Sequence, residues 1–181
     1  MAKIKLNAAS GGGSVSFEAP ASLASDKVIK FPNSPNVPIQ IIHKDYRTFF
    51  STNTLIPLDD SIPQNTEGAE VFTQAITPTS SSNFIQITVV LNMSNSDVNN
   101  LHVAAVFRDS GVNAIGAGWA KCVGTNAPSS PMVINFTDSP NTTSAVTYKV
   151  RVGYSGNVAS VVQVNGGSGR PLPPLTWTTD A

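Results

Sequence analysis

The sequence predicts an all-β protein: an antiparallel β-sandwich or jelly-roll-like domain of about eight strands with an extended N-terminal arm. Three features of the chain lead to this prediction. Apolar and polar residues alternate in several short runs with the two-residue period of a half-buried strand. Gly, Pro, Asn and Ser separate these runs at regular spacing, and no stretch shows a convincing helical period.

The chain is organised around a strand expected at residues 146–154, where Val and Tyr at every second position alternate cleanly with Thr, Lys and Arg. Residues 138–141, Asp-Ser-Pro-Asn, supply turn chemistry before it, because Pro fixes φ and the Asp and Asn side chains bond nearby backbone groups. The preceding run at residues 131–136 is short, apolar and β-prone. Together these segments predict a strand, a turned loop and a second strand that form the C-terminal core of the domain.

The other strands are expected at intervals along the chain, separated by polar loops. A long loop around a short strand is expected at residues 53–68, where prolines and acidic residues gather. Gly116 and Gly118 lie inside a strand run, which predicts a bulge or a close approach of the backbone. The remaining strand runs are residues 39–50, 71–77, 85–91, 101–108, 115–123 and 158–164.

Composition divides the chain into a Gly/Ser/Pro-rich arm at residues 1–38, a sandwich domain at residues 39–165 and a Gly/Pro-rich tail at residues 166–181. The arm contains short β-prone runs that cannot bury their apolar residues alone. It is therefore either a flexible tail or an extended segment ordered on neighbouring chains or on another protein. In the second case, the residues expected to mediate attachment and assembly are Ile4, Leu6, Val15, Phe17, Val28, Ile29 and Phe31.

The charge composition limits the classes of partner. Charged residues make up 12% of the chain and hydrophobic residues 40%, so a packed core is possible and the surface consists mainly of hydroxyls and amides. Lys plus Arg and Asp plus Glu number 11 each, and no basic cluster is present, which argues against nucleic-acid binding. A net charge of zero gives little protection against self-association and favours a component of an assembly. Cys122 cannot form an intramolecular disulfide and is interpreted as a small buried apolar residue near Trp119.

No residue pattern predicts an active site, so we expect no catalytic residue, no cofactor and no metal ligand, and the protein is not expected to be an enzyme. Hydrolysis of a glycan requires two facing carboxylates. The candidates in this chain are Asp59, Asp60, Glu67 and Glu70. They gather in or beside one polar loop, where acidic residues are usually solvated. The histidines His43 and His102 lack zinc-ligand spacing and are interpreted as strand residues with ordinary hydrogen bonds.

Targeting signals are not apparent in the sequence. Residues 1–6 include two lysines but no apolar run follows them, so no secretory signal is expected. No run approaches the roughly 18 apolar residues of a membrane span. The protein is therefore expected to be made in a cytoplasm, without membrane insertion, and to reach the outside as part of a larger assembly.

Aromatic side chains with a polar rim favour recognition of proteins and glycans. The candidates for receptor contact are Tyr46, Tyr154 and Trp177. A position in the core or in a subunit interface is the alternative for each of them and the more common one. Trp177, near the end of the sequence, is either an anchor against the domain or part of an exposed contact surface.

Two motifs are distinctive. Residues 136–150 follow the pattern F-x-D-S-P-x-T-T-S-A-x-T-Y-K-V, and residues 5–16 read KLNAASGGGSVS, followed by Glu18-Ala19-Pro20. The first motif resembles small C-terminal domains of tail-fibre proteins from marine and cyanobacterial phages, and the second is similar to a linker repeated in those fibres. The resemblance implies a homotrimeric virion protein. Its arm would attach to another virion protein of the tail or baseplate, and its sandwich would face a glycan or protein of the host surface.

A capsid decoration or cement protein is the alternative function. In that case the arm would stitch neighbouring capsomers together and the sandwich would stand on the shell. Both functions place the protein in a virion.

Overall fold

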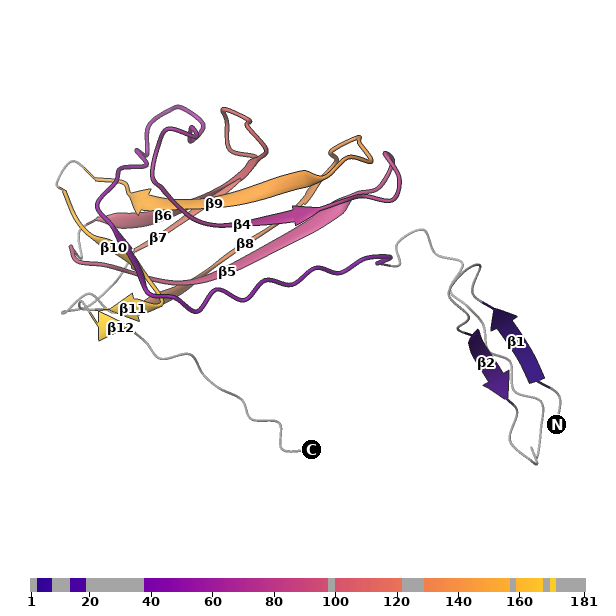
Figure 1. Ribbon diagram of the computed structural model, residues 1–181. Coiled ribbons are helices and arrows are strands. Elements are labelled where there is room, and N and C mark those ends of the chain that lie inside the picture. The colour runs from indigo at the N-terminus through magenta and orange to yellow at the C-terminus, as the bar shows by residue number, and fades with distance from the viewer. Residues whose placement is uncertain are drawn as a thin grey trace. The chain divides into compact units, whose positions relative to one another are not determined.

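The computed structural model of the chain describes residues 3–7, 14–18, 38–97, 100–121, 129–156, 159–167 and 170–171 (Figure 1). The chain divides into two compact units, Met1–Ile41 and Ile42–Ala181. In the first unit, β1 (Lys3–Asn7) pairs antiparallel with β2 (Ser14–Glu18). The second unit contains the other strands, and no helix occurs among the described residues.

The second unit is a sandwich of two four-stranded sheets. The β5 sheet has the order β3-β10-β5-β8, and the β9 sheet has the order β4-β9-β6-β7. Their bounds are β3 (Phe50–Thr52), β4 (Ala69–Ile76), β5 (Ile85–Asn95), β6 (Leu101–Arg108), β7 (Gly116–Lys121), β8 (Ser130–Asp138), β9 (Val146–Tyr154) and β10 (Val162–Val164). The short strands β11 (Gly166–Gly167) and β12 (Arg170–Pro171) pair with each other.

The strand pairing is nested. Strand β3 pairs with β10, β4 with β9, β5 with β8 and β6 with β7, all antiparallel. This is the pairing of one long hairpin rolled into two layers, which is a jelly roll. The prediction of an all-β antiparallel sandwich of about eight strands is therefore confirmed, and the strand order selects the jelly roll among the forms that the sequence allowed.

The strand predicted at residues 39–50 is wrong for most of its length, because of that run only Phe50 belongs to a strand, β3. Residues 42–49 form no strand although their sequence is β-prone. The adjacent strand β10 ends at Val164, and Asn165 has a positive φ of 56°, so no strand continues beside this segment. Instead, the side-chain amide of Asn165 donates hydrogen bonds to the carbonyl oxygens of Tyr46 and Thr48, at 2.8 and 3.2 Å.

Two other predicted boundaries change for local reasons. Of the strand predicted at residues 158–164, position 158 lies outside the described residues, residues 159–161 are not in a strand, and Val162–Val164 form β10. The N–H of Val161 donates instead to Oγ of Ser96 at 2.8 Å. The turn predicted at residues 138–141 begins after Asp138, because Asp138 completes β8 opposite Ile85.

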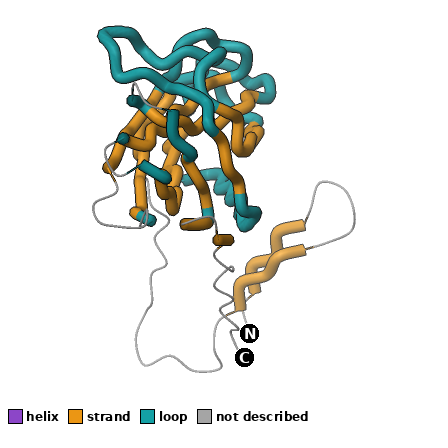
Figure 2. The backbone as a smooth tube through the Cα atoms, turned by 90° about the vertical axis from the view of Figure 1, so that its left-hand side faces the viewer, coloured by secondary structure: helices purple, strands orange, loops and turns teal. Residues whose placement is uncertain are grey.

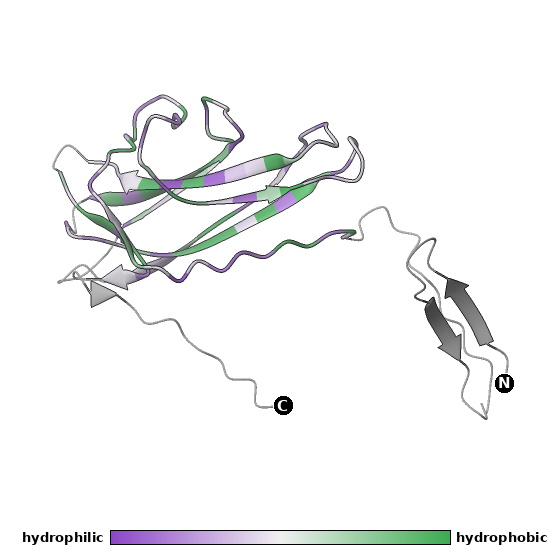
Figure 3. Cartoon of the chain, viewed as in Figure 1, coloured by the Kyte–Doolittle hydropathy of each residue, from purple (hydrophilic) through white to green (hydrophobic). Residues whose placement is uncertain are grey.

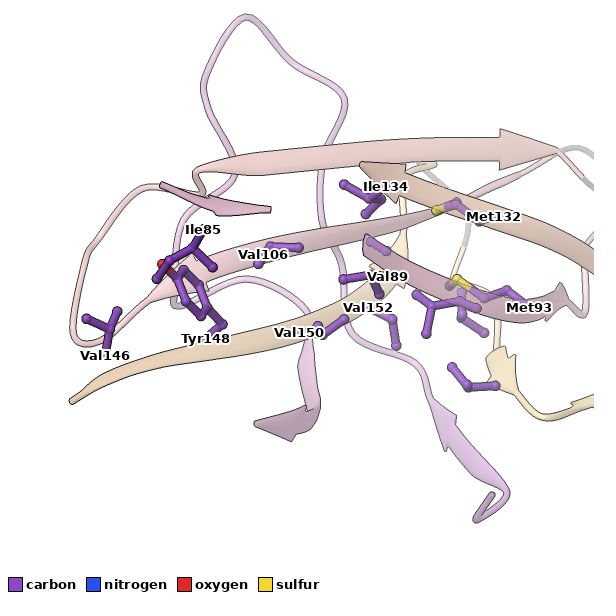
Figure 4. Packing of buried hydrophobic residues seen from close by; sticks show 14 residues of the cluster. Ile85, Val89, Met93, Val106, Met132, Ile134, Val146, Tyr148, Val150 and Val152 are labelled. Atoms are coloured by element: carbon purple, nitrogen blue, oxygen red, sulfur yellow. The ribbon is translucent and has the colours of Figure 1, made fainter. Parts of the chain in front are cut away.

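The core lies between the two sheets, and the side chains that fill it come from alternate positions of the strands (Figure 4). Strand β9 contributes Val146, Tyr148, Val150 and Val152, all buried as the alternation predicted. The same alternation is visible as hydrophobic and hydrophilic bands along the strands (Figure 3). The cluster also contains Ile85, Val89, Leu91, Met93, Ala104, Val106, Met132, Ile134, Val162 and Val164.

The outer face of the β9 sheet is covered by loops of the same chain (Figure 2). Val103, Ala105 and Phe107 alternate with core positions of β6 and so lie on this outer face, yet they are buried. In the loop between β3 and β4, Ile56 is fully buried and its N–H donates to the carbonyl oxygen of Tyr154 at 2.8 Å.

Side chains of β9 fix this loop. The guanidinium of Arg151 donates to the carbonyl oxygens of Glu67 and Gly68, both at 2.7 Å. Gly153 allows the loop to cross closely, because a Cβ there would lie 2.7 Å from the carbonyl oxygen of Thr54 and 2.9 Å from Cγ1 of Ile56. The β9 sheet is thus buried on both faces along its centre.

Of the bulge or close approach predicted for Gly116 and Gly118, the structure shows a close approach at Gly116, where β7 packs against β8 at one side of the sandwich. A Cβ on Gly116 would lie 2.5 Å from Cε1 of Phe136, which is well inside van der Waals contact. A Cβ on Gly118 would lie 3.4 Å from Cγ1 of Ile134, which is close to an ordinary contact. Only Gly116 is therefore required by the packing.

We predict that Gly116→Ala destabilises the domain by about 1–3 kcal/mol through overpacking, whereas Gly118→Ala changes the free energy of unfolding far less. Chemical denaturation of the two variants beside the wild type measures the difference. The double variant Gly116→Ala/Phe136→Leu should regain part of the loss, since the smaller side chain relieves the contact. Equal effects of the two single alanine substitutions would contradict this account of the packing.

Candidate interaction surface

The structure brings four of the predicted attachment residues together in the first unit. In the β1–β2 hairpin, Ile4 pairs with Phe17 and Leu6 pairs with Val15. Because alternate residues of a strand lie on the same side and paired residues share it, these four positions fall on one face of the hairpin. The predicted attachment residues at positions 28, 29 and 31 lie outside the described residues.

Two of the three predicted receptor contacts lie in the second unit. The ring of Tyr46 stacks on that of Phe72 with centroids 5.6 Å apart, and its side chain is half-buried. Tyr154 ends β9, packs partly against the core and donates its N–H to the carbonyl oxygen of Thr54 at 3.1 Å. Position 177 lies outside the described residues. The structure assigns Tyr46 and Tyr154 packing contacts, and their contact with a receptor stays a prediction.

Three of the four acidic residues considered for glycan hydrolysis, Asp59, Glu67 and Glu70, lie against polar groups of the same chain. Asp59 accepts hydrogen bonds from the N–H and Oγ of Ser61, at 2.8 and 2.6 Å, and these bonds lower the pKa of its carboxyl group. Glu67 accepts the N–H of Gln64 at 2.9 Å. Glu70 lies 4.0 Å from the guanidinium of Arg151. Among the described residues, no group of three His, Cys, Asp or Glu side chains is placed to hold a metal ion.

Asp138 links the two layers of the sandwich. The guanidinium of Arg108 donates to both of its carboxylate oxygens, at 2.9 and 3.1 Å, and the hydroxyl of Tyr148 donates to Oδ2 at 2.7 Å. Burial, followed by the hydrogen bond to Asp138, raises the pKa of Tyr148, so its phenol stays protonated and keeps the bond. This cluster at one end of the sandwich connects β8 of one sheet with β6 and β9 of the other.

Several buried polar side chains lie on β5, β6 and the segments beside β10, and the sequence did not predict the bonds that they form. His102 is fully buried, and its Nε2 lies 3.2 Å from Oγ of Ser130. Other buried bonds run from Ser94 Oγ to the carbonyl oxygen of Gly166 at 2.9 Å and from Asn100 Nδ2 to Ser160 Oγ at 3.2 Å. The one signal available for His102 was phase, because position 102 lies on the same side of its strand as the core positions 104 and 106. These bonds indicate a structural role for the buried polar residues.

Burial lowers the pKa of His102 to about 4, from an ordinary value near 6.5. The folded domain therefore holds His102 neutral at a pH at which the unfolded chain binds a proton. Stability from this residue is fully present above about pH 6.5 and falls between roughly pH 6.5 and 4, by up to about 3 kcal/mol.

We predict that calorimetry of the wild type between pH 7 and 4 shows this loss of stability, and that His102→Asn flattens it. The slope with pH, rather than the absolute stability, is the readout, because any replacement also disturbs packing. His43, which is exposed, provides the control: His43→Asn should keep the wild-type slope. A wild-type slope in the His102 variant would show that another group carries the pH dependence.

The outer face of the β5 sheet presents no charged side chain from its two long strands. Asp138, the only charged residue in the strands of this sheet, points inward to Arg108 and Tyr148. The outward positions, which alternate with core residues, are Gln86, Thr88, Val90 and Asn92 on β5 and Pro131, Val133, Asn135 and Thr137 on β8. We call these eight residues the β5–β8 strip.

The centre of the β5–β8 strip is apolar and its surroundings are polar. Val90 and Val133 are directly opposite each other in the ladder and are 67% and 60% exposed. Next to them, Oγ1 of Thr137 donates to Oε1 of Gln86 at 3.0 Å, and the amide of Gln86 donates to Oδ1 of Asn135. These lateral bonds hold the amides and hydroxyls in place before any partner arrives. The sequence signal for this surface was the lack of charge at residues 84–96 and 129–137.

The comparisons assign no family. A scan against protein-family models matches none, and a search of the curated proteins finds no match. Within the described residues there is no helix that could cross a membrane.

Proposed function

We propose that this protein is a structural protein of a phage virion, a tail fibre that attaches by its N-terminal arm and presents its β-sandwich for adhesion to the host surface. The observation that carries the proposal is that the chain consists of two compact units with different surfaces. One unit holds a hairpin whose apolar positions Ile4, Leu6, Val15 and Phe17 share a face, and the other is a separate jelly-roll domain. The motifs at residues 5–16 and 136–150 supply the tail-fibre resemblance.

The arm attaches through the apolar face of the β1–β2 hairpin. A two-stranded hairpin is at best marginally stable alone in water. A hairpin with one apolar face gains stability when that face is buried against a partner, here another virion protein of the tail or baseplate. This supports the attachment role of the four residues.

The sandwich acts by adhesion without catalysis. The chain assembles as a homotrimer, so several copies of a weak contact with a host glycan or protein act together. Such multivalency strengthens attachment greatly without any new contact. Asp59 and Glu67 in the β3–β4 loop and Glu70 at the start of β4 serve local structure in this proposal, as their contacts with Ser61, Gln64 and Arg151 support.

A capsid decoration or cement protein is the second candidate. The observation in its favour is the jelly-roll strand order, which is common in viral capsid domains and also in lectins. A fold of this kind hosts many functions, so the strand order alone does not choose between tail and head.

Immunogold labelling of intact virions with an antibody against residues 39–181 tests the proposal. We expect gold at the tail end of the particle. Gold spread over the head would refute the tail-fibre function and support the capsid decoration function. Particles without gold would refute both functions. Virions of a phage that lacks the gene provide the control for antibody specificity.

Attachment through the hairpin predicts that Phe17→Asp greatly reduces the amount of protein on purified virions, because a carboxylate enters the buried face. Ser16→Asp is the matched control: it adds the same charge at the neighbouring position, on the opposite face. Quantitative immunoblots of virions measure incorporation, and the thermal unfolding of the sandwich should be unchanged in both variants. Equal incorporation of the two variants would argue against attachment by this face.

A further inference from the structure

The two outer faces of the sandwich differ in how exposed their apolar side chains are. On the β9 sheet, the outward residues Val103, Ala105 and Phe107 are buried under loops of the same chain. On the β5 sheet, the outward residues Val90 and Val133 are mostly exposed in the part of the chain that the structure describes. Exposed, adjacent apolar side chains on a rigid sheet are typical of a surface that another molecule covers.

The chemistry of the β5–β8 strip restricts what that molecule can be. A nucleic acid or an acidic protein requires cations and a basic protein requires anions, and the eight residues of the strip include neither. The strip also has no aromatic ring on which a sugar could stack. An apolar centre with uncharged amides and hydroxyls around it matches the core of a protein–protein interface, where charged residues are depleted.

We propose that the β5–β8 strip is the surface through which this protein binds a second copy of itself. A chain with zero net charge approaches its own copy without long-range repulsion, and a strip without charges buries no unpaired ion on contact. The partner is also present at the same concentration wherever the protein is made. This inference rests on the self-assembly in the proposed function and identifies its surface, and it holds for a tail or a head location alike.

The size of the strip sets the strength of the contact. The paired register of β5 and β8 runs from Ile85 to Met93, a length of roughly 30 Å, and two strands span roughly 10 Å in width. The area of the strip, which is the product of this length and width, is smaller than the roughly 800 Å² that each partner contributes to a standard interface. We therefore expect association that depends on concentration and is followed best between micromolar and sub-millimolar protein.

Sedimentation equilibrium of the full chain tests the proposal. The wild type should associate with rising concentration, and Val133→Lys should weaken the association by about tenfold or more, because it places an ammonium group in the apolar centre. Val133→Thr keeps the β-branched shape and should weaken it less. Thermal unfolding followed by circular dichroism verifies that each variant is folded.

Val112→Lys is the matched control, since Val112 is also 60% exposed but lies in the loop between β6 and β7. It should associate like the wild type. A wild type with the mass of one chain at every concentration overturns the inference and the homotrimer of the proposed function, and leaves the strip to another protein, while immunogold labelling tests the virion location separately. Unchanged association of folded Val133→Lys overturns the choice of surface but not the proposed function. Loss of association in Val133→Lys together with virions that carry no gold supports the surface while the proposed function fails.

Discussion

Strand β9 is the element on which the jelly roll depends, because it is used on both edges and on both faces. Its edges pair with β4 and β6. Its inner side chains fill the core, and its outer positions Arg151 and Gly153 hold the loop between β3 and β4. The hydroxyl of Tyr148 reaches Asp138 in the other sheet and ties the two layers together. A strand with contacts on both edges and both faces tolerates few substitutions, and its sequence alternates cleanly between apolar and polar residues.

The burial of β9 makes the sandwich asymmetric, and the asymmetry has a functional consequence. The β9 sheet includes the charged residues Glu70, Lys149 and Arg151 and is covered by its own loops. The β5 sheet includes one charged residue in its strands, which is turned inward, and the outward residues Val90 and Val133 are mostly exposed. A domain built in this way has one face completed by its own chain and one face that another molecule can complete.

The N-terminal unit differs from the sandwich because its hairpin is too small to bury its apolar residues by itself. A hairpin of two five-residue strands cannot form a core, so the apolar positions of β1 and β2 are useful only against a partner. In the proposed function, the hairpin supplies attachment and the sandwich supplies assembly and adhesion. The two units therefore have separate contacts and separate tests.

The sequence by itself determined the local geometry. Alternation at residues 146–152 identified the inward side chains of β9, and Gly116 in a strand indicated a close approach, because both depend on a residue and its near neighbours. Tertiary structure decided the rest. Residues 42–49 have a β-prone sequence but pair with no strand in the described structure, and the strip depends on pairs such as Gln86 and Thr137, which are 51 residues apart. A two-residue period places side chains on two faces, but which face is covered depends on segments that are distant in sequence, and a local pattern contains no information about them.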